Sequence, residues 1–144
     1  MTDADRPFRP RLARMVSLVI ALGVAALTVL LVAALSKVPW SDRTGMGLVG
    51  LAVAWFCWRE ASVAARPDPD GLTVRNLVLV RHLDWAEIVD VRFGQGRPWV
   101  QLDLADGDTL AVMAIQRADG AAADTEARRL ATLVARHAAT PRDD

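Results

Sequence analysis

Residues 85–113 read WAEIVDVRFGQGRPWVQLDLADGDTLAVM, and this stretch decides the fold. Apolar and polar side chains alternate over residues 88–93 and again over residues 99–104, which is the period of a strand with one face in a core. Asp106 and Gly107 form a strong signal for a tight hairpin turn, and residues 109–113 follow as its return strand. The glycines and the proline of residues 94–98 predict a loop. The stretch therefore predicts an antiparallel meander.

Working outward, two further strands are predicted upstream, at residues 71–76 and 77–83, after a turn-rich linker at residues 64–70. Downstream, an amphipathic helix is predicted from about residue 124 to residue 139, with Asp124 as its N-cap. Its apolar stripe consists of Ala127, Leu130, Ala131, Val134 and Ala138. Because so short a domain has a small core, the helix must bury this stripe against the sheet. A domain over residues 71–139, with a short tail at 140–144, is expected.

A run of 21 uncharged residues at positions 15–35 precedes this domain and follows an arginine-rich tail at residues 1–14. A helix of that length is roughly 30 Å long, which matches the hydrocarbon core of a bilayer. We expect a transmembrane helix. The alternative is a secretory signal peptide, since Ala34 and Ser36 form a weak cleavage pattern, but the apolar part of such peptides is usually only ~7–15 residues long.

A second transmembrane helix is expected over residues 44–63, although it has only 15 uncharged residues in a row. A helix of these residues is roughly 22 Å long, which lies between the lengths typical of membrane-spanning and of non-spanning segments. Trp40 lies before this segment and Trp55 and Trp58 lie near its end, as in the aromatic belts of membrane proteins. With the short external loop at residues 36–43, these features favour a spanning hairpin.

Basic residues predict the orientation of this hairpin. Four arginines precede the first helix and three follow the uncharged run of the second, at positions 59, 66 and 75, whereas the loop holds one lysine and one arginine. The positive-inside rule therefore places both termini in the cytoplasm, at the inner face of the cell membrane. Small residues at four-residue steps favour close helix packing, either within the hairpin or between copies, or else reflect ordinary composition. They are Ser17, Ala21 and Ala25 on the first helix, and Gly50 and Ala54 on the second.

Four stretches carry a resemblance to a known family: WAEIVDVRF at 85–93, RPW at 97–99, LDL at 102–104 and AVMAIQRADG at 111–120. With the preceding helix pair, they resemble the actinobacterial membrane-anchored PH-domain family of the low-molecular-weight protein antigen type. The resemblance covers residues 67–138. It implies a two-helix transmembrane hairpin followed by a small PH-like antiparallel β split barrel, capped by the C-terminal helix. The five predicted strands fall one or two short of seven, so the others either lie within residues 59–68 or are absent.

Charge is divided between the two halves of the chain. The 17 basic and 17 acidic side chains give a balance of +4 over residues 1–66 and −4 over residues 67–144. An acidic water-soluble half argues against a polybasic nucleic-acid binder. Such a half also meets an anionic leaflet unfavourably, and Arg75 and Arg81 are flanked by aspartates. We therefore expect no phosphoinositide headgroup site.

No arrangement typical of catalysis stands out. Cys57 is the single cysteine, and His82 and His137 are expected in different elements. A calcium loop needs more oxygens and a spaced glutamate than the aspartates of the predicted hairpin supply, namely Asp103, Asp106 and Asp108. We expect no enzyme, no cofactor and no metal.

Trp85, Trp99 and Arg97 form the candidate interaction surface, with core or corner packing as the alternative for both tryptophans. The sequence predicts a non-catalytic, membrane-anchored interaction module that binds a protein partner or a second copy, for example through an exposed sheet edge. The alternative is an accessory subunit of a membrane transporter or envelope-assembly complex. The middle of neither helix carries an ionisable residue, which makes an ion pathway within one chain unexpected.

Overall fold

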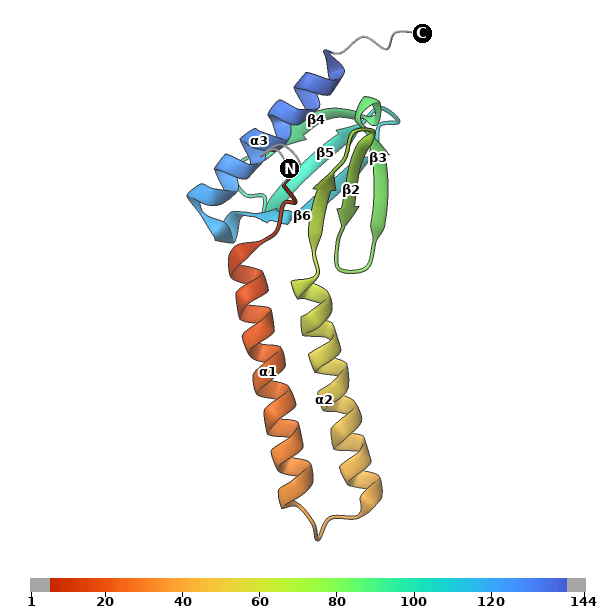
Figure 1. The fold of residues 1–144 in the computed structure, drawn as a ribbon, viewed down its shortest axis with the longest axis vertical. Helices are drawn as coiled ribbons and strands as arrows, with labels where there is room; N and C mark the ends of the chain where they lie inside the picture. The colour runs from red at the N-terminus through yellow and green to blue at the C-terminus, as the bar shows by residue number, and fades with distance from the viewer. Residues whose placement is uncertain (1–5, 140–144) are drawn as a thin grey trace. The chain divides into compact units, whose positions relative to one another are not determined.

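The structure, a computed structural model, describes residues 6–139 and divides into two units. One is a helical unit of residues 13–62. The other, which we call the β domain, combines residues 6–12 with residues 63–139. The β domain is therefore discontinuous in sequence, and the helical unit is inserted into it (Figure 1). This differs from the expected order, in which the whole domain follows the helices.

Two antiparallel sheets of three strands each build the β domain. The first contains β1 (Ala64–Pro67), β2 (Gly71–Arg75) and β3 (Val80–Asp84). The second contains β4 (Ile88–Arg92), β5 (Trp99–Leu104) and β6 (Thr109–Gln116). Within each sheet every strand pairs with its neighbour in the chain, so each sheet is a meander. The sequence predicts one continuous meander of about five strands, whereas the chain divides into two sheets between β3 and β4. Gly107 has a φ of 90° in the turn between β5 and β6, which explains the glycine of the Asp-Gly pair.

Most strand boundaries agree with the predictions. β5 has the predicted bounds, whereas β6 continues past residue 113 and β3 begins three residues late because residues 76–79 form a turn. β1 lies where a linker was expected. Its sequence, Ala-Ala-Arg-Pro, lacks the apolar alternation that reveals a strand. One of the strands missing from the prediction therefore does lie within residues 59–68.

The C-terminal helix, α3 (Ala121–Ala138), packs onto the sheets. It begins before the expected Asp124, because Gly120, with a φ of 60°, takes the N-cap position. Its buried side chains are Ala123, Ala127, Leu130, Leu133 and Val134. Ala131 and Ala138 of the predicted stripe are exposed, since the buried face turns toward Leu133.

Residues 6–12, which we call the N-terminal arm, complete the first sheet beside β1. Phe8 forms both backbone hydrogen bonds of an antiparallel bridge with Ala65, at 2.8 and 3.0 Å. Its side chain is 1% exposed and is among the largest in the core. The β domain has six strands, and the bridged segment of the arm takes the place of a seventh. The arm, expected from the sequence as part of the N-terminal tail over residues 1–14, thus belongs to the β domain. Residues 1–5, and the expected tail at 140–144, lie outside the described residues.

Side chains of α3 and of the turn before it hold the arm in place. The guanidinium of Arg129 lies 3.7 Å from the centre of the Phe8 ring and also donates to the carbonyl of Arg6. Arg6 pairs with Glu126 at 2.7 Å. Asp119 accepts the backbone N–H groups of Arg11 and Leu12, at 2.9 and 2.8 Å. The arm is thus an integral part of the β domain.

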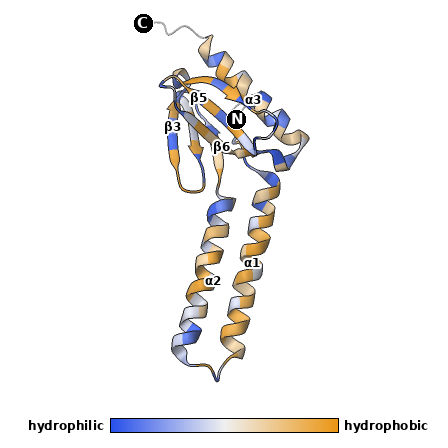
Figure 2. Cartoon of the chain, turned by 180° about the vertical axis from the view of Figure 1, so that it is seen from behind, coloured by the Kyte–Doolittle hydropathy of each residue, from blue (hydrophilic) through white to orange (hydrophobic). Residues whose placement is uncertain are grey.

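The helical unit consists of α1 (Arg11–Ala34) and α2 (Trp40–Ala61), joined by residues 35–39. Among the described helices, only α1 is both long and apolar enough to cross a membrane, with a mean hydropathy of 2.8 over its most apolar window. Figure 2 shows the difference, since α1 is almost uniformly apolar and α2 is mixed. Two spans were predicted, and by length and hydropathy only α1 meets the requirement.

Small residues do bring the two helices close together. Ser17 and Ala21 lie on the half-buried face of α1, as predicted, but Ala25 is exposed and the face continues through Val24 and Thr28. This spacing of four, three and four residues is typical of a left-handed helix pair. On α2, Gly50 is buried opposite Thr28. The predicted small-residue packing therefore operates within one chain at this point.

Substitution of Gly50 by alanine is expected to destabilise the helix pair. A Cβ atom at this position would lie 2.2 Å from Thr28 Oγ1 and 2.8 Å from Thr28 Cβ, so rotation of the threonine cannot relieve the overlap. Overpacking of this kind costs about 1–3 kcal/mol. Denaturant titration of the detergent-solubilised chain would measure the loss. Gly47→Ala is the matched control, because its Cβ would meet nothing within 4 Å. Equal effects of the two substitutions would contradict the packing described.

Candidate interaction surface

Trp85 lies in the corner between the two sheets. This corner is the short helix η2 (Trp85–Glu87), closed by a reciprocal cap between Asp84 and Glu87. The indole is only 5% exposed, donates its N–H to the carbonyl of Asp68 at 3.0 Å, and stacks on His137 with ring centres 4.4 Å apart. Trp85 is therefore a core residue that fixes the last turn of α3 to the corner, which is the packing alternative considered above.

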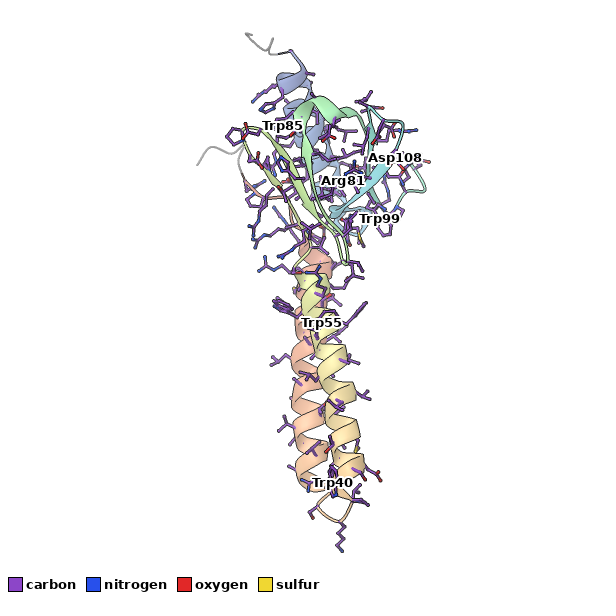
Figure 3. All side chains as sticks on the ribbon, turned by 90° about the vertical axis from the view of Figure 1, so that its right-hand side faces the viewer. Trp40, Trp55, Arg81, Trp85, Trp99 and Asp108 are labelled. Atoms are coloured by element: carbon purple, nitrogen blue, oxygen red, sulfur yellow. The ribbon has the colours of Figure 1, made fainter. Side chains whose placement is uncertain are left out.

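The three predicted surface residues do not come together. Trp99 starts β5, whereas Ala105, just past the other end of β5, donates its backbone N–H to Glu87 in the corner helix. Trp85 and Trp99 are accordingly at opposite ends of that strand, and Figure 3 shows them well apart. Arg97 is half-buried in the loop before Trp99. Of the predicted set, only Arg97 and Trp99 are neighbours.

Arg117 organises the loop that holds Arg97, a role that the sequence reading missed. Its guanidinium donates to the carbonyls of Arg97 and Gly94, at 3.2 and 2.9 Å, and lies 4.3 Å from the centre of the Phe93 ring. Arg117 lies inside the stretch at residues 111–120 that resembles the family, and this was the one feature that could have singled it out. An exposed arginine after a strand is common, so it does not by itself predict a role in holding a loop.

The aspartates of the β5–β6 hairpin serve local structure. Asp103 pairs with Arg92, and this hydrogen bond, followed by the charge of Asp103, raises the pKa of the arginine. Asp106 accepts the backbone N–H of Asp108 within the turn and lies 3.8 Å from Arg81. Within residues 6–139, no three acidic, histidine or cysteine side chains are arranged to hold a metal ion.

His82 lies on the exposed face of β3, between two carboxylates. Its ring nitrogens are 3.8 Å from Asp68 and 3.7 Å from Asp84, and Nδ1 is 2.9 Å from the hydroxyl of Thr73. The side chain is 46% exposed. Water screens ion pairs in such a position, so these contacts contribute little to stability.

Two of the hollows on the described part of the β domain bear on the candidate surface. One, of about 180 Å³, lies between the N-terminal arm and the start of α3, and its two carboxylates, Asp119 and Glu126, are already bonded to the arm. The other, of about 210 Å³, lies on the first sheet. Its lining residues are Ala64, Arg66, Thr73, Arg75 and Val80. The first hollow thus belongs to the surface on which the arm packs. The second is an open depression lined by two arginines.

The turn between β2 and β3 has an unusual apolar sequence. Residues 77–80, which we call the β2–β3 tip, read Leu-Val-Leu-Val, and Val78 is 86% exposed. Asn76 holds the tip in place, because its buried amide donates to the carbonyl of Ala111 at 2.7 Å and accepts the N–H of Met113 at 3.1 Å. The sequence pattern predicts a strand over these residues. It therefore gives no indication that they form an exposed apolar surface in a turn.

Comparison with known proteins assigns the fold. A family profile described as a bacterial PH domain matches residues 62–133, which is half of the chain. The chain belongs to the bacterial PH domain family. The matched residues run from the start of β1 into α3, so the PH domain of this chain consists of the matched region and the N-terminal arm that pairs with it.

The PH domain has mycobacterial relatives, in agreement with the resemblance found in the sequence. An uncharacterized protein of Mycobacterium tuberculosis and one of Mycobacterium bovis are each 36% identical over 97 residues. The alignment covers 67% of this chain and 63% of each relative, so the chain matches less than two thirds of their length. No solved structure matches the chain.

The arm changes the charge of the PH domain. Residues 1–12 and 63–144, the two stretches of sequence that make up this unit, together contain thirteen arginines and fifteen acidic side chains, a balance of −2. The balance over residues 67–144 alone is −4. The arm therefore reduces the net negative charge of the domain, and so the repulsion expected from an anionic leaflet, but does not remove it.

The two sheets differ in how their outer edges are protected. β4 carries a register shift between Ile88 and Asp90, and the Asp90 carboxylate accepts the backbone N–H of Val91. Both features hinder pairing with another strand. β3 pairs with β2 along its whole length without a register shift, and no strand of the described residues 6–139 lies beyond it in the sheet. The β3 edge is thus the more open of the two.

Proposed function

We propose that this chain is a non-catalytic, membrane-anchored PH module. In this proposal α1 and α2 both cross the cell membrane, the PH domain lies at its inner face, and a protein partner or a second copy binds there. The helices keep the domain at the membrane, and the fold serves as a scaffold for interaction.

The bridge between Phe8 and Ala65 carries this proposal. The arm lies just before α1 and β1 lies just after α2, yet both belong to one folded domain. This pairing supports an arrangement in which both ends of the helical unit lie on the same side of the bilayer. If α1, which has the necessary length and hydropathy, spans the membrane, the same arrangement favours a return span by α2.

Features of α2 support its return through the bilayer. Its 22 residues extend about 33 Å, enough to cross the hydrocarbon core. Trp40 at one end and Trp55 and Trp58 toward the other are well exposed, as interfacial aromatic side chains are. Arg43 donates to the carbonyl of Val32 at 2.7 and 3.0 Å, which satisfies part of its hydrogen-bonding capacity near the end of the span.

Cysteine labelling with a membrane-impermeant maleimide tests this topology. In a Cys57→Ser background, Lys37→Cys reports on the turn between the helices and Ala86→Cys reports on the PH domain. We expect Lys37→Cys to react in intact spheroplasts and Ala86→Cys to react only after permeabilisation, because they lie on opposite sides. The reverse pattern, or a shorter mature chain produced by cleavage near Ala34, would contradict the proposal.

The open edge of β3 is the proposed route for a protein partner. An added strand would gain backbone hydrogen bonds there without displacing any part of the domain. A photo-crosslinking residue in place of His82 is expected to form adducts in native membranes, either with a partner or with a second copy. The same residue in place of Arg128, exposed on α3, is the control. Adducts of equal yield at both positions would argue against the β3 edge.

A further inference from the structure

The β2–β3 tip concentrates the exposed apolar surface of the PH domain. Among large apolar side chains of residues 63–139, the exposed ones are Val78, Leu79, Val80 and Val89. Three of these four are consecutive, two in the turn and Val80 as the first residue of β3. Turns are usually built from glycine, asparagine, aspartate and proline, so a turn of aliphatic residues needs a physical reason.

The tip is also held rigidly, which argues against incidental exposure. Asn76 makes two hydrogen bonds to β6, and its backbone N–H donates to the carbonyl of Leu79 at 2.8 Å. A buried amide side chain fixed in this way sets the direction of the turn that follows it. The backbone of the tip is therefore anchored to β6.

Strand register places the tip at a defined end of the first sheet. Ala64, the first residue of β1, pairs with Arg75, which in turn pairs with Val80 of the tip. In Figure 1 the loop between β2 and β3 accordingly lies where β1 begins. Ala64 is three residues beyond the last residue of α2, and Phe8 of the bridge is three residues before α1. Both connections to the helical unit therefore leave from the end of the domain that carries the tip.

Four arginines lie on the first sheet or at the connections to the helical unit. Arg66 and Arg75 line the same depression as Val80. Arg9 and Arg11 lie in the arm immediately before and at the start of α1. Aliphatic residues flanked by arginines are typical of segments that enter the boundary between headgroups and acyl chains, where arginines meet anionic lipid.

We infer that the β2–β3 tip inserts into the membrane leaflet nearest the PH domain and forms a third point of contact with the bilayer beside the two helices. The inference rests on the proposed function, because the membrane-spanning hairpin supplies the bilayer. The contact is with lipid in general, through apolar insertion and charge, and involves no headgroup pocket. This contact would restrict the rotation of the domain over the membrane. The short connections to the two helices restrict that rotation less.

The test uses the full chain in nanodiscs of phosphatidylcholine and phosphatidylglycerol. In the Cys57→Ser background, Val78→Cys carries the polarity-sensitive fluorophore NBD. We expect blue-shifted emission, protection from aqueous iodide, and loss of fluorescence when nitroxide-labelled lipid is included. Ala86→Cys, exposed in the corner at the other end of β3, is the matched control and is expected to behave as a probe in water.

The outcomes separate this inference from the proposed function. An aqueous signal from Val78→Cys, in a chain whose Lys37→Cys still reacts from outside, would overturn the inference and leave the hairpin intact. A blue-shifted signal that nitroxide lipid does not quench would also overturn it, since protein would then cover the tip. Leu79→Asp in the labelled chain is expected to abolish lipid quenching, whereas Thr132→Asp on α3 is expected to leave it unchanged.

Discussion

A chain that lacks residues 1–12 is expected to lose the folded PH domain, although every strand and α3 remain present. Phe8 is 1% exposed in the middle of the core, and Pro10 is also fully buried. Removal of a buried phenylalanine side chain alone costs about 3–5 kcal/mol. The stack of Arg129 on its ring adds about 0.5–2 kcal/mol. A domain of this size has a total stability of about 5–10 kcal/mol, so little would remain.

A second variant distinguishes the arm from the helices. Replacement of residues 13–62 by about eight glycine and serine residues, which reach at most ~28 Å, reconnects the arm directly to β1. This variant is expected to unfold cooperatively in urea, whereas a chain beginning at residue 63 is expected to be sensitive to protease without denaturant. In the linked variant, Phe8→Ala should lower the urea midpoint sharply and Phe8→Leu much less. Equal protease resistance with and without the arm would contradict the role assigned to it.

Trp85→Ala is expected to destabilise the PH domain by about 3–5 kcal/mol, the range for truncation of a large buried aromatic side chain. The substitution removes the stack on His137 and leaves the carbonyl of Asp68 without its indole donor. Pulse proteolysis of the full chain across a urea series measures the loss. Because His137 is in the last turn of α3, early cleavage should occur near the C-terminal end of that helix.

Two further substitutions separate the contributions of Trp85. Trp85→Phe retains an aromatic ring for His137 and loses the hydrogen bond, so it is expected to cost about 1–2 kcal/mol. Trp99→Ala, at a half-buried position, should cost clearly less than Trp85→Ala. A larger effect at Trp99 would mean that the packing assigned to the corner is incorrect.

Local patterns predicted the parts of the fold that depend on neighbours in sequence. The alternation of residues 99–104 gives the observed bounds of β5, and the Asp-Gly pair gives the turn after it. β1 was not predicted because Ala-Ala-Arg-Pro lacks apolar alternation, and the arm was not predicted because its pairing is long-range. A single phenylalanine between arginines and prolines has no period, and only its bridge to a residue 57 positions away makes it structural.

The candidate surface was harder to predict than the fold, for a related reason. Trp85 and Trp99 are equally aromatic in sequence, and only the packing of α3 onto the corner buries one and leaves the other half-exposed. Residues 77–80 have the composition of a strand, and their exposure follows from the two hydrogen bonds that Asn76 makes with β6. Neither contact has a local signature.

The discontinuous PH domain has a consequence for biosynthesis. Phe8 leaves the ribosome long before Ala65, and closing a loop of this length costs roughly 3–4 kcal/mol of chain entropy. In the proposed topology, an inserted hairpin returns the chain to the starting side and brings these ends together, which offsets that entropy. In that topology, a chain whose second helix failed to insert would leave Phe8 and Ala65 on opposite sides of the membrane and could not complete its core. Folding of the domain would then depend on correct membrane insertion, and misinserted copies are expected to be degraded.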